Sequence, residues 1–265
     1  MSLTVAEVLK LIDQRAPFAS AAEWDAVGLQ IGDPYRPVSK VAVVHEITER
    51  VVKEVIAAEA DLVVTYHPLV FEPLRSVIAG PGQKGRAFAL LEARIAVVAV
   101  HTNWDTAPGG TSDSLAAALD IRSTDPFASA TTGSGETQWF GRCGRFGGTV
   151  GDLVDLVRQR LGNRVRVSEP QEDRVLGRVA VLPGAGGSYS QEALLAGADA
   201  YVTGDVAHHQ ARLLADNGVV VVDAGHTPTE RPGIKALGSF MAEISGEVID
   251  LVGVDDDPWE WEWKG

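Results

Sequence analysis

Residues 41–67 read VAVVHEITERVVKEVIAAEADLVVTYH, and a related stretch begins 138 residues further along the chain, at Val179. That second stretch, residues 179–205, reads VAVLPGAGGSYSQEALLAGADAYVTGD and shares nine of its 27 residues with the first, without a gap. Average residue usage would give roughly two identities by chance. Each stretch has the pattern strand, helix, strand, which predicts an α/β fold with a duplicated unit.

The rest of the chain also alternates uninterrupted apolar strands with amphipathic helices, which is typical of largely parallel sheets covered on both faces. We therefore expect duplicated strand–helix–strand units that form two packed α/β lobes. The expected lobes cover residues 1–123 and 137–265, and both contribute to one site. Residues 123–138, rich in Ser, Thr and Gly, are the predicted linker. We expect a turn at Pro228 that enters a helix from about Thr229.

Composition limits the classes of function. The chain has 265 residues, 45% of them hydrophobic, and a formal net charge of −13, which disfavours nucleic acid as a partner. We expect no membrane partner, because no apolar run is long enough to span a bilayer. The N-terminal segment is amphipathic and acidic, unlike a signal peptide. The single cysteine, Cys143, fits a reducing compartment, so we expect a cytoplasmic protein.

A local basic cluster interrupts this acidic chain in its second half. Its members are Arg142, Arg145, Arg158, Arg160, Arg164 and Arg166. We expect the cluster to be the solvated face of a helix and a strand, with contact to an anionic ligand as the alternative.

Histidines and acids collect directly after predicted strands, where ligands gather in parallel sheets. The set comprises His67, His101, Asp105, Asp205, His208, His209, His226 and Glu230. Divalent ions such as Zn, Mn, Fe or Ni take imidazole and carboxylate ligands. One such histidine alone is more often structural, but the joint placement favours a metal site. The pairs His101/Asp105 and His226/Glu230 are each spaced i, i+4, which presents two groups to one ion on a helix or in a tight turn.

Several motifs together resemble a known family. They are Trp24-Asp25-x-x-Gly28-Leu29, Thr65-Tyr-His67-Pro-Leu-x-Phe71, His101-Thr-Asn-x-Asp105, Thr203-Gly-Asp205 and Gly225-His226-x-x-Thr-Glu230. In this order, and over nearly the whole chain, they resemble the NGG-interacting-factor-three-like superfamily, whose bacterial members are often labelled GTP cyclohydrolase I type 2 homologues. The resemblance implies a duplicated α/β fold whose two packed lobes have a metal cleft between them, a dinuclear metal site in that cleft, and a ring-shaped homohexamer.

Residue by residue, the resemblance implies a metal ligand set. The matching positions are His67, Asp105, His226 and Glu230, with Glu230 bridging both ions. The family usually has a histidine where this chain has Tyr66, a candidate ligand only as a phenolate, and its ordinary pKa near ~10 makes that costly. His45 is a candidate replacement; alternatively it is a coincidental partner of Glu46. We therefore predict one or two ions per chain, and nearer one tight ion than two.

Two functions compete at this point. The first is a metal-dependent hydrolase that acts on a nucleotide-like or phosphorylated small molecule through a metal-activated water, with His101, or one of His208 and His209, moving the proton. The second is a non-catalytic metal-binding protein, such as a metal chaperone or regulator. The glycine-rich turn at 184–187 either cradles a phosphate or is a tight turn. Trp259, Trp261 and Trp263 near the C-terminus are expected to pack on the same chain or on a neighbour.

Overall fold

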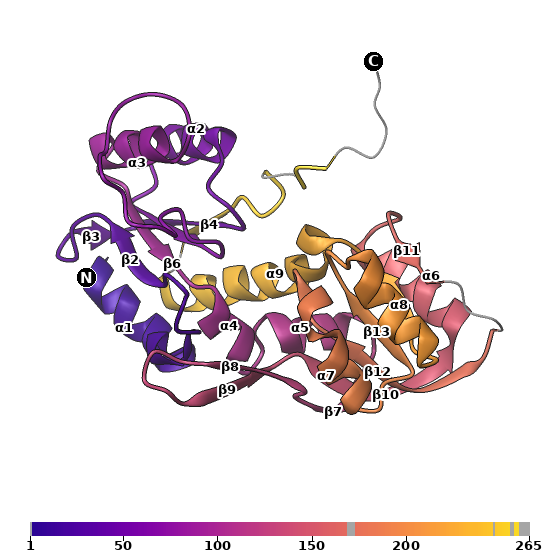
Figure 1. Ribbon diagram of the computed structural model, residues 1–265. Coiled ribbons are helices and arrows are strands. Elements are labelled where there is room, and N and C mark those ends of the chain that lie inside the picture. Colours follow the sequence, from indigo (N-terminus) through magenta and orange to yellow (C-terminus); the bar gives the residue numbers. More distant parts are fainter. Residues whose placement is uncertain (1, 169–172, 246, 255–256, 260–265) are drawn as a thin grey trace, which may run out of the picture. The chain divides into compact units, whose positions relative to one another are not determined.

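The computed structural model describes residues 2–168, 173–245, 247–254 and 257–259 (Figure 1). Two compact units make up the chain. Unit 1 comprises Met1–Pro108, Thr131–Gln138 and Ile234–Asp256, and unit 2 comprises Gly109–Ala130, Trp139–Gly233 and Asp257–Gly265. Both units are discontinuous in sequence, because the chain returns to the first sheet after completing the second. The predicted boundaries, residues 1–123 and 137–265, divide the chain into its two sequence repeats and stay a prediction.

Unit 1 contains a five-stranded sheet with the order β15-β4-β5-β6-β2. Its strands are β2 (Gly28–Ile31), β4 (Lys40–Val44), β5 (Leu62–Thr65), β6 (Ala96–Ala99) and β15 (Glu247–Asp250). The first four strands of that order run parallel, and β2 is antiparallel to β6. Every residue of β5 and β6 is buried, which explains their uninterrupted apolar character.

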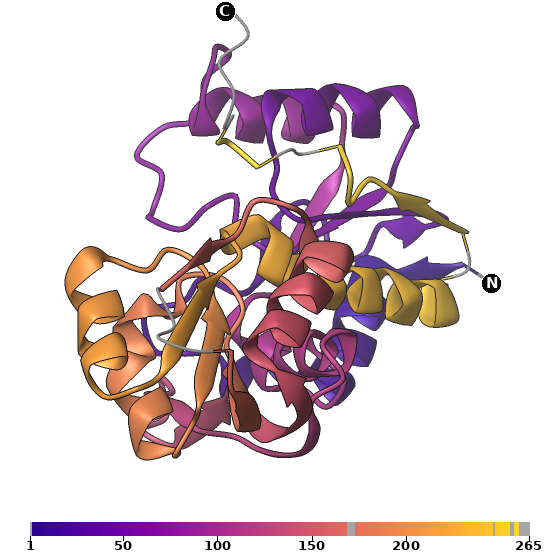
Figure 2. The ribbon, with the colours of Figure 1, turned by 90° about the vertical axis from the view of Figure 1, so that its right-hand side faces the viewer.

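Helices cover both faces of this sheet (Figure 2). The helical segments and short strands of unit 1 are α1 (Val5–Arg15), η1 (Phe18–Ser20), α2 (Glu49–Ala57), α3 (Gln83–Glu92), α4 (Thr102–Thr106), β1 (Leu3–Thr4) and β3 (Pro37–Val38). The pair α2 and α3 packs on one face, whereas α1 and residues 234–245 pack on the other. A capping box between Thr4 and Glu7 starts α1, and the Thr48 side chain caps α2.

Unit 2 contains a six-stranded sheet with the order β11-β14-β13-β12-β10-β7. The strands are β7 (Arg122–Asp125), β10 (Arg142–Thr149), β11 (Arg166–Val167), β12 (Val175–Val181), β13 (Ala200–Thr203) and β14 (Val220–Asp223). The helical segments are α5 (Thr111–Ala118), α6 (Val150–Leu161), η2 (Gly186–Tyr189), α7 (Ser190–Leu195), α8 (His208–Asp216) and the start of α9 (His226–Ser245). Helices α5 and α6 pack on one face, and α7 and α8 on the other.

The repeated stretches pair their strands in the same register. In unit 1, β4 pairs with β5 in parallel and Val41 lies opposite Leu62. In unit 2, β12 pairs with β13 in parallel and Val179 lies opposite Ala200. Both positions of the second pair are those of the first plus 138 (41 + 138 = 179 and 62 + 138 = 200). The sequence offset thus reappears as an offset in strand pairing.

Two local expectations were wrong. The segment 123–138 is not a linker, because it contains most of β7, then β8 (Ala128–Thr131) and the start of β9 (Thr137–Phe140); β8 and β9 form a two-stranded sheet and β7 pairs with β10. Helix α9 starts at His226 rather than after a turn at Pro228. A proline fits the first turn of a helix because no helical partner exists there for its missing N–H.

Among the described residues, no helix combines the length and apolar character that a membrane span needs. Cys143 is buried in β10, and burial raises the pKa of its thiol, with the nearby Arg178 acting in the opposite direction. Of the three C-terminal tryptophans, Trp259 is exposed and its carbonyl oxygen accepts a hydrogen bond from Arg164. Trp261 and Trp263 lie outside the described residues.

Candidate metal centre

In unit 1, three histidines follow the carboxyl ends of neighbouring parallel strands. His45 follows β4, His67 comes shortly after β5, and His101 follows β6. The backbone amide of His67 donates to the carbonyl of His45 at 2.9 Å, which extends the parallel pairing past the strand ends. These positions place imidazole groups together at one edge of the sheet, as expected for a ligand site in a parallel α/β sheet.

The rings of these residues contact one another. The ring centroids of His45 and His67 are 4.5 Å apart, and those of His67 and His101 are 5.4 Å apart. A ring nitrogen of His45 lies within 4.8 Å of a ring nitrogen of His67. His45 is buried and its ring stacks on that of Tyr66, with 12° between the planes. His45 is therefore part of the histidine cluster, which agrees with its candidacy as a replacement ligand.

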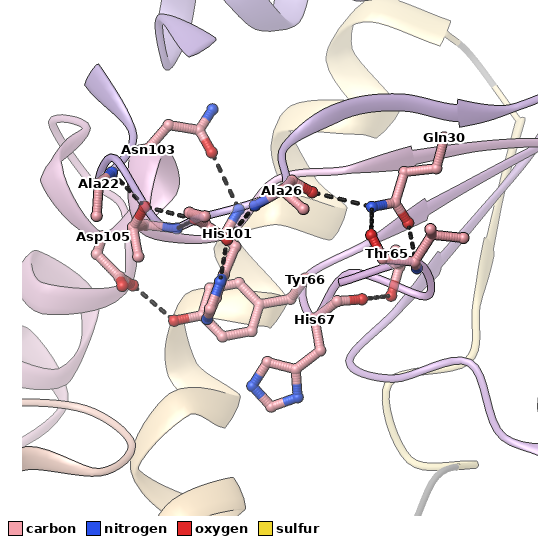
Figure 3. A network of polar contacts seen from close by, with 12 residues as sticks. Ala22, Ala26, Gln30, Thr65, Tyr66, His67, His101, Asn103 and Asp105 are labelled. Atoms are coloured by element: carbon pink, nitrogen blue, oxygen red, sulfur yellow. Dashed lines mark hydrogen bonds and ion pairs between the residues drawn. The ribbon is translucent and has the colours of Figure 1, made fainter. Parts of the chain in front are cut away.

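Tyr66 acts as a hydrogen-bond donor in this cluster (Figure 3). Its hydroxyl donates to Oδ1 of Asp105 at 2.6 Å, and its side chain is buried. Asp105 lies on α4, one helical turn after His101. A phenol that donates to a carboxylate keeps its proton, so this geometry does not favour Tyr66 as a phenolate ligand.

His101 is oriented by a carboxylate. Its Nδ1 lies 2.9 Å from Oδ1 of Asp25, whose other oxygen accepts hydrogen bonds from the amide and hydroxyl of Thr102. Burial favours a higher pKa for the Asp25 carboxyl, but the contacts with His101 and Thr102 outweigh burial and lower it. Asp25 is thus an anion that binds the proton on Nδ1 of His101. When neutral, the ring then carries its lone pair on Nε2.

In unit 2, His226 is held between two acids. Its Nδ1 lies 2.7 Å from Oδ2 of Asp205, and its Nε2 lies 3.1 Å from Oε1 of Glu230, which is nearly fully buried. The i, i+4 spacing of His226 and Glu230 on α9 brings the second pair together. Burial lowers the pKa of His226, but the two carboxylates outweigh it and raise the pKa to about 9.

Gly184 makes room for Glu230. Its φ is +71°, and a Cβ added there would lie 2.4 Å from Oε1 of Glu230 and 3.4 Å from Nε2 of His226. Its amide donates to the hydroxyl of Thr229 at 2.9 Å, which ties the turn after β12 to α9. Packing also explains the next glycines, since a Cβ at Gly186 would lie 2.0 Å from Oγ1 of Thr203. Close backbone approach therefore accounts for this turn without a phosphate.

The structure groups the predicted residues in two sets. His67, His101, Asp105 and Tyr66 belong to unit 1, and His226 and Glu230 belong to unit 2. His209 and its neighbour His208, the other candidates for proton transfer, are exposed in the first turn of α8. In the described part of the chain, neither side chain has a hydrogen bond or ion pair, so the assignment of His209 rests on the sequence alone.

The sequence did not assign roles to the two acids that orient the histidines. Asp25 lies in the Trp24-Asp25-x-x-Gly28-Leu29 motif, which was a usable signal because the motif ends just as β2 begins beside β6. Asp205 was considered only as a ligand. Its φ of +53° is a left-handed conformation that aspartate tolerates, and its side chain reaches His226 from there.

Comparison with known proteins identifies the family of the chain. A family model described as Duf34/NIF3 (NGG1p interacting factor 3) matches residues 3–255. The chain belongs to this family. The resemblance found in the sequence is confirmed.

Relatives in the NIF3 family align along most of the chain. A protein of Streptomyces coelicolor named GTP cyclohydrolase 1 type 2 homolog is 33% identical over 247 residues, which are 91% of this chain and 86% of the relative. A Streptococcus pneumoniae protein of the same name is 31% identical over 259 residues, covering 94% of this chain and 96% of the relative. The crystal structure of a Bacillus cereus protein related to NIF3 has a TM-score of 0.88 at 24% identity, with 98% and 99% of the two chains covered, and shows the shared α/β fold.

Proposed function

We propose that this NIF3-family chain binds a divalent cation with His45, His67 and Glu230 as its principal ligands. Asp105 and His226 are the further ligands in this proposal. The proposed site combines metal-donor side chains from both units, as expected from the two copies of the sequence repeat. The proximity of the His45 and His67 rings, at the ends of adjacent parallel strands, is the observation that carries it.

The residues present fit such an ion. Neutral imidazole and carboxylate are the donors of Zn, Mn, Fe and Ni sites. Glu230 is nearly fully buried, and its oxygen and Nε2 of His226 face each other at 3.1 Å. A buried carboxylate needs a positive partner, and the imidazolium of His226, whose pKa the carboxylates raise, is such a partner. A divalent ion would replace that proton as the positive charge.

The same residues support a hydrolase. A bound cation would supply Lewis acidity and lower the pKa of a coordinated water. Asp25 fixes the proton of His101 on Nδ1, which leaves Nε2 as the atom that accepts a proton from a nucleophile. Tyr66 holds Asp105 through the 2.6 Å hydrogen bond and so fixes the direction of that carboxylate. The names of the two relatives suggest a nucleotide-like or otherwise phosphorylated small molecule as the substrate.

The proposal includes two further points that come from the sequence. The lobes are copies of one ancestral unit, which the shared register of β4/β5 and β12/β13 supports. The protein assembles into a homohexamer, which light scattering coupled to size-exclusion chromatography tests through the mass in solution.

Elemental analysis of the purified protein tests the function. Glu230→Gln should lose most of the metal, because it removes a buried anionic ligand. Glu243→Gln is the matched control, since Glu243 lies on the same helix and is exposed. Equal metal content in both variants would contradict the proposal.

A screen of the metal-loaded protein against nucleotides and phosphoesters then separates the two functions. Turnover that disappears in Glu230→Gln supports the hydrolase. Bound metal without turnover of any of these compounds contradicts the hydrolase and favours a non-catalytic metal-binding protein.

A further inference from the structure

Three arginines form one row across the sheet of unit 2. Arg145 on β10 is the direct strand partner of Arg178 on β12 and of Arg122 on β7. Directly opposite residues of antiparallel strands project from the same face, with Cβ atoms about 4.5–5.5 Å apart, and like charges in such pairs are destabilising. A bound anion would therefore stabilise a row of three positive charges.

The described part of the chain does not supply that anion within 4.0 Å, because none of these three arginines has an ion pair there. Nε of Arg178 is buried without a hydrogen-bond partner, and its Nη2 contacts only the sulfur of Cys143, at 3.6 Å. Three arginines of the predicted basic cluster, in contrast, have an acidic partner. Arg142, Arg158 and Arg166 pair with Asp113, Asp155 and Asp223 respectively.

Two of the nearby acids are engaged elsewhere. Asp152 accepts hydrogen bonds from the amide and hydroxyl of Thr149 as part of a helix cap. Asp199 accepts hydrogen bonds from the amides of Gly177 and Arg178 and pairs with Arg174. Asp120 is the other acid in the same pocket wall, and among the described residues it forms no ion pair with Arg122, Arg145 or Arg178.

The row lines an open pocket of about 1140 Å³. Phe146 and Leu156 provide apolar surface beside the arginines, and Gly147 completes that wall. A pocket of this size accommodates a small organic molecule. It combines three unpaired guanidinium groups with an apolar surface, a combination that suits an anion attached to an organic group.

We propose that this pocket binds a small molecule with two adjacent phosphate groups, a diphosphate ester. The phosphates contact Arg122, Arg145 and Arg178, and the organic group contacts Phe146 and Leu156. Guanidinium groups form paired, charge-assisted hydrogen bonds to phosphate oxygens, which makes arginine well suited to this ligand. The net charge of −13 disfavours a long nucleic acid as the ligand. This site lies wholly in unit 2 and does not depend on the proposed metal centre.

Calorimetric titration of the full chain tests the proposal, with inorganic pyrophosphate and a nucleoside diphosphate as the two probes. We expect both to bind, and the nucleoside diphosphate to bind more tightly because it also contacts the apolar wall. Arg145→Gln should weaken both at least about tenfold, the effect of one charge-assisted hydrogen bond. Arg158→Gln is the matched control, because Arg158 is an exposed arginine on α6 with its own acidic partner.

A second variant blocks the pocket without removing charge. A Cβ at Gly147 meets no atom within 4 Å and its φ lies outside the left-handed region, so Gly147→Leu extends into the pocket without backbone strain. Binding of the nucleoside diphosphate should fall at least about tenfold in this variant. His67→Ala should leave the affinity for pyrophosphate unchanged, since that residue belongs to the metal centre.

Three results would overturn the proposal. The first is the absence of binding by pyrophosphate. The second is an equal loss of affinity in Arg145→Gln and Arg158→Gln, which would indicate only non-specific attraction. The third is a loss in His67→Ala together with unchanged binding in Gly147→Leu, which would place the anion at the metal centre.

Discussion

Replacement of Gly184 by alanine tests the packing around Glu230. The added Cβ would lie 2.4 Å from Oε1 of Glu230, about 1 Å inside normal contact distance. The φ of +71° costs a residue with a Cβ roughly 1–2 kcal/mol, and overpacking in a buried site costs typically about 1–3 kcal/mol more. We therefore expect the free energy of unfolding of the metal-free protein to fall by about 2–5 kcal/mol.

Gly197 provides a matched control for the backbone term. Its φ is also +71°, but a Cβ added there meets no atom within 4 Å. Gly197→Ala should therefore cost only the roughly 1–2 kcal/mol of the left-handed conformation. Urea unfolding in the presence of a chelator measures both variants, and calorimetric titration measures their metal affinity.

The metal affinities of the two variants show whether crowding at Gly184 also disturbs Glu230 as a metal ligand. If Glu230 is a metal ligand as proposed, displacement of its carboxylate by about 1 Å would break the ligand bond, so Gly184→Ala should bind the metal at least about tenfold more weakly than the unmodified chain. Gly197→Ala should bind it normally. Equal losses of stability in the two variants, together with unchanged metal affinity in both, would refute this reasoning.

Three further predictions concern charge and stoichiometry. Metal binding at pH 7 should release about one proton, because the pKa of His226 is raised to about 9 and the ring is protonated in the metal-free protein. Calorimetry in buffers with different ionisation enthalpies measures the number of protons released. A value near zero would exclude His226 as a ligand. The unmodified chain should hold nearer one tight ion than two, and Tyr66→His should restore the second; two tight equivalents that persist in His45→Ala would contradict this prediction. The lowered pKa of Asp25 stabilises the metal-free protein above the unfolded pKa of about 3.9, and this stabilisation is lost as the pH falls through the lower folded pKa. In Asp25→Asn the drop in unfolding free energy between pH 5 and pH 3 should be smaller, and an unchanged drop would show that Asp25 does not contribute.

Local sequence patterns predicted the features that depend on neighbours along the chain. The repeat at an offset of 138 residues predicted the order of strand and helix in residues 41–67 and 179–205. The strands β4, β5 and β13 within them are buried, which explains their apolar sequences. The position of His45, His67 and His101 after adjacent strands followed from the same pattern. Parallel strands bring such residues together because their carboxyl ends share one edge of the sheet.

Features that depend on distant pairing could not be predicted in this way. The stretch 123–138 has the composition of a linker, yet pairing with β10 and between β8 and β9 makes it strand. The contact of Asp25 with His101 joins segments 76 residues apart, and the motif that contains Asp25 does not indicate which residue is its partner. The arginine row likewise depends on the strand register of β7, β10 and β12, which includes an irregularity between Cys143 and Arg145.

Metal titration of two single variants tests the central claim most directly, that one ion takes ligands from both units. His67→Ala removes a proposed ligand of unit 1 and Glu230→Gln removes a proposed ligand of unit 2. If both residues bind the same ion, each variant should lose the same tight equivalent in calorimetric titration of the metal-free full chain. A tight equivalent retained at full affinity in either variant would show that its residue does not bind that ion, and would contradict a shared centre.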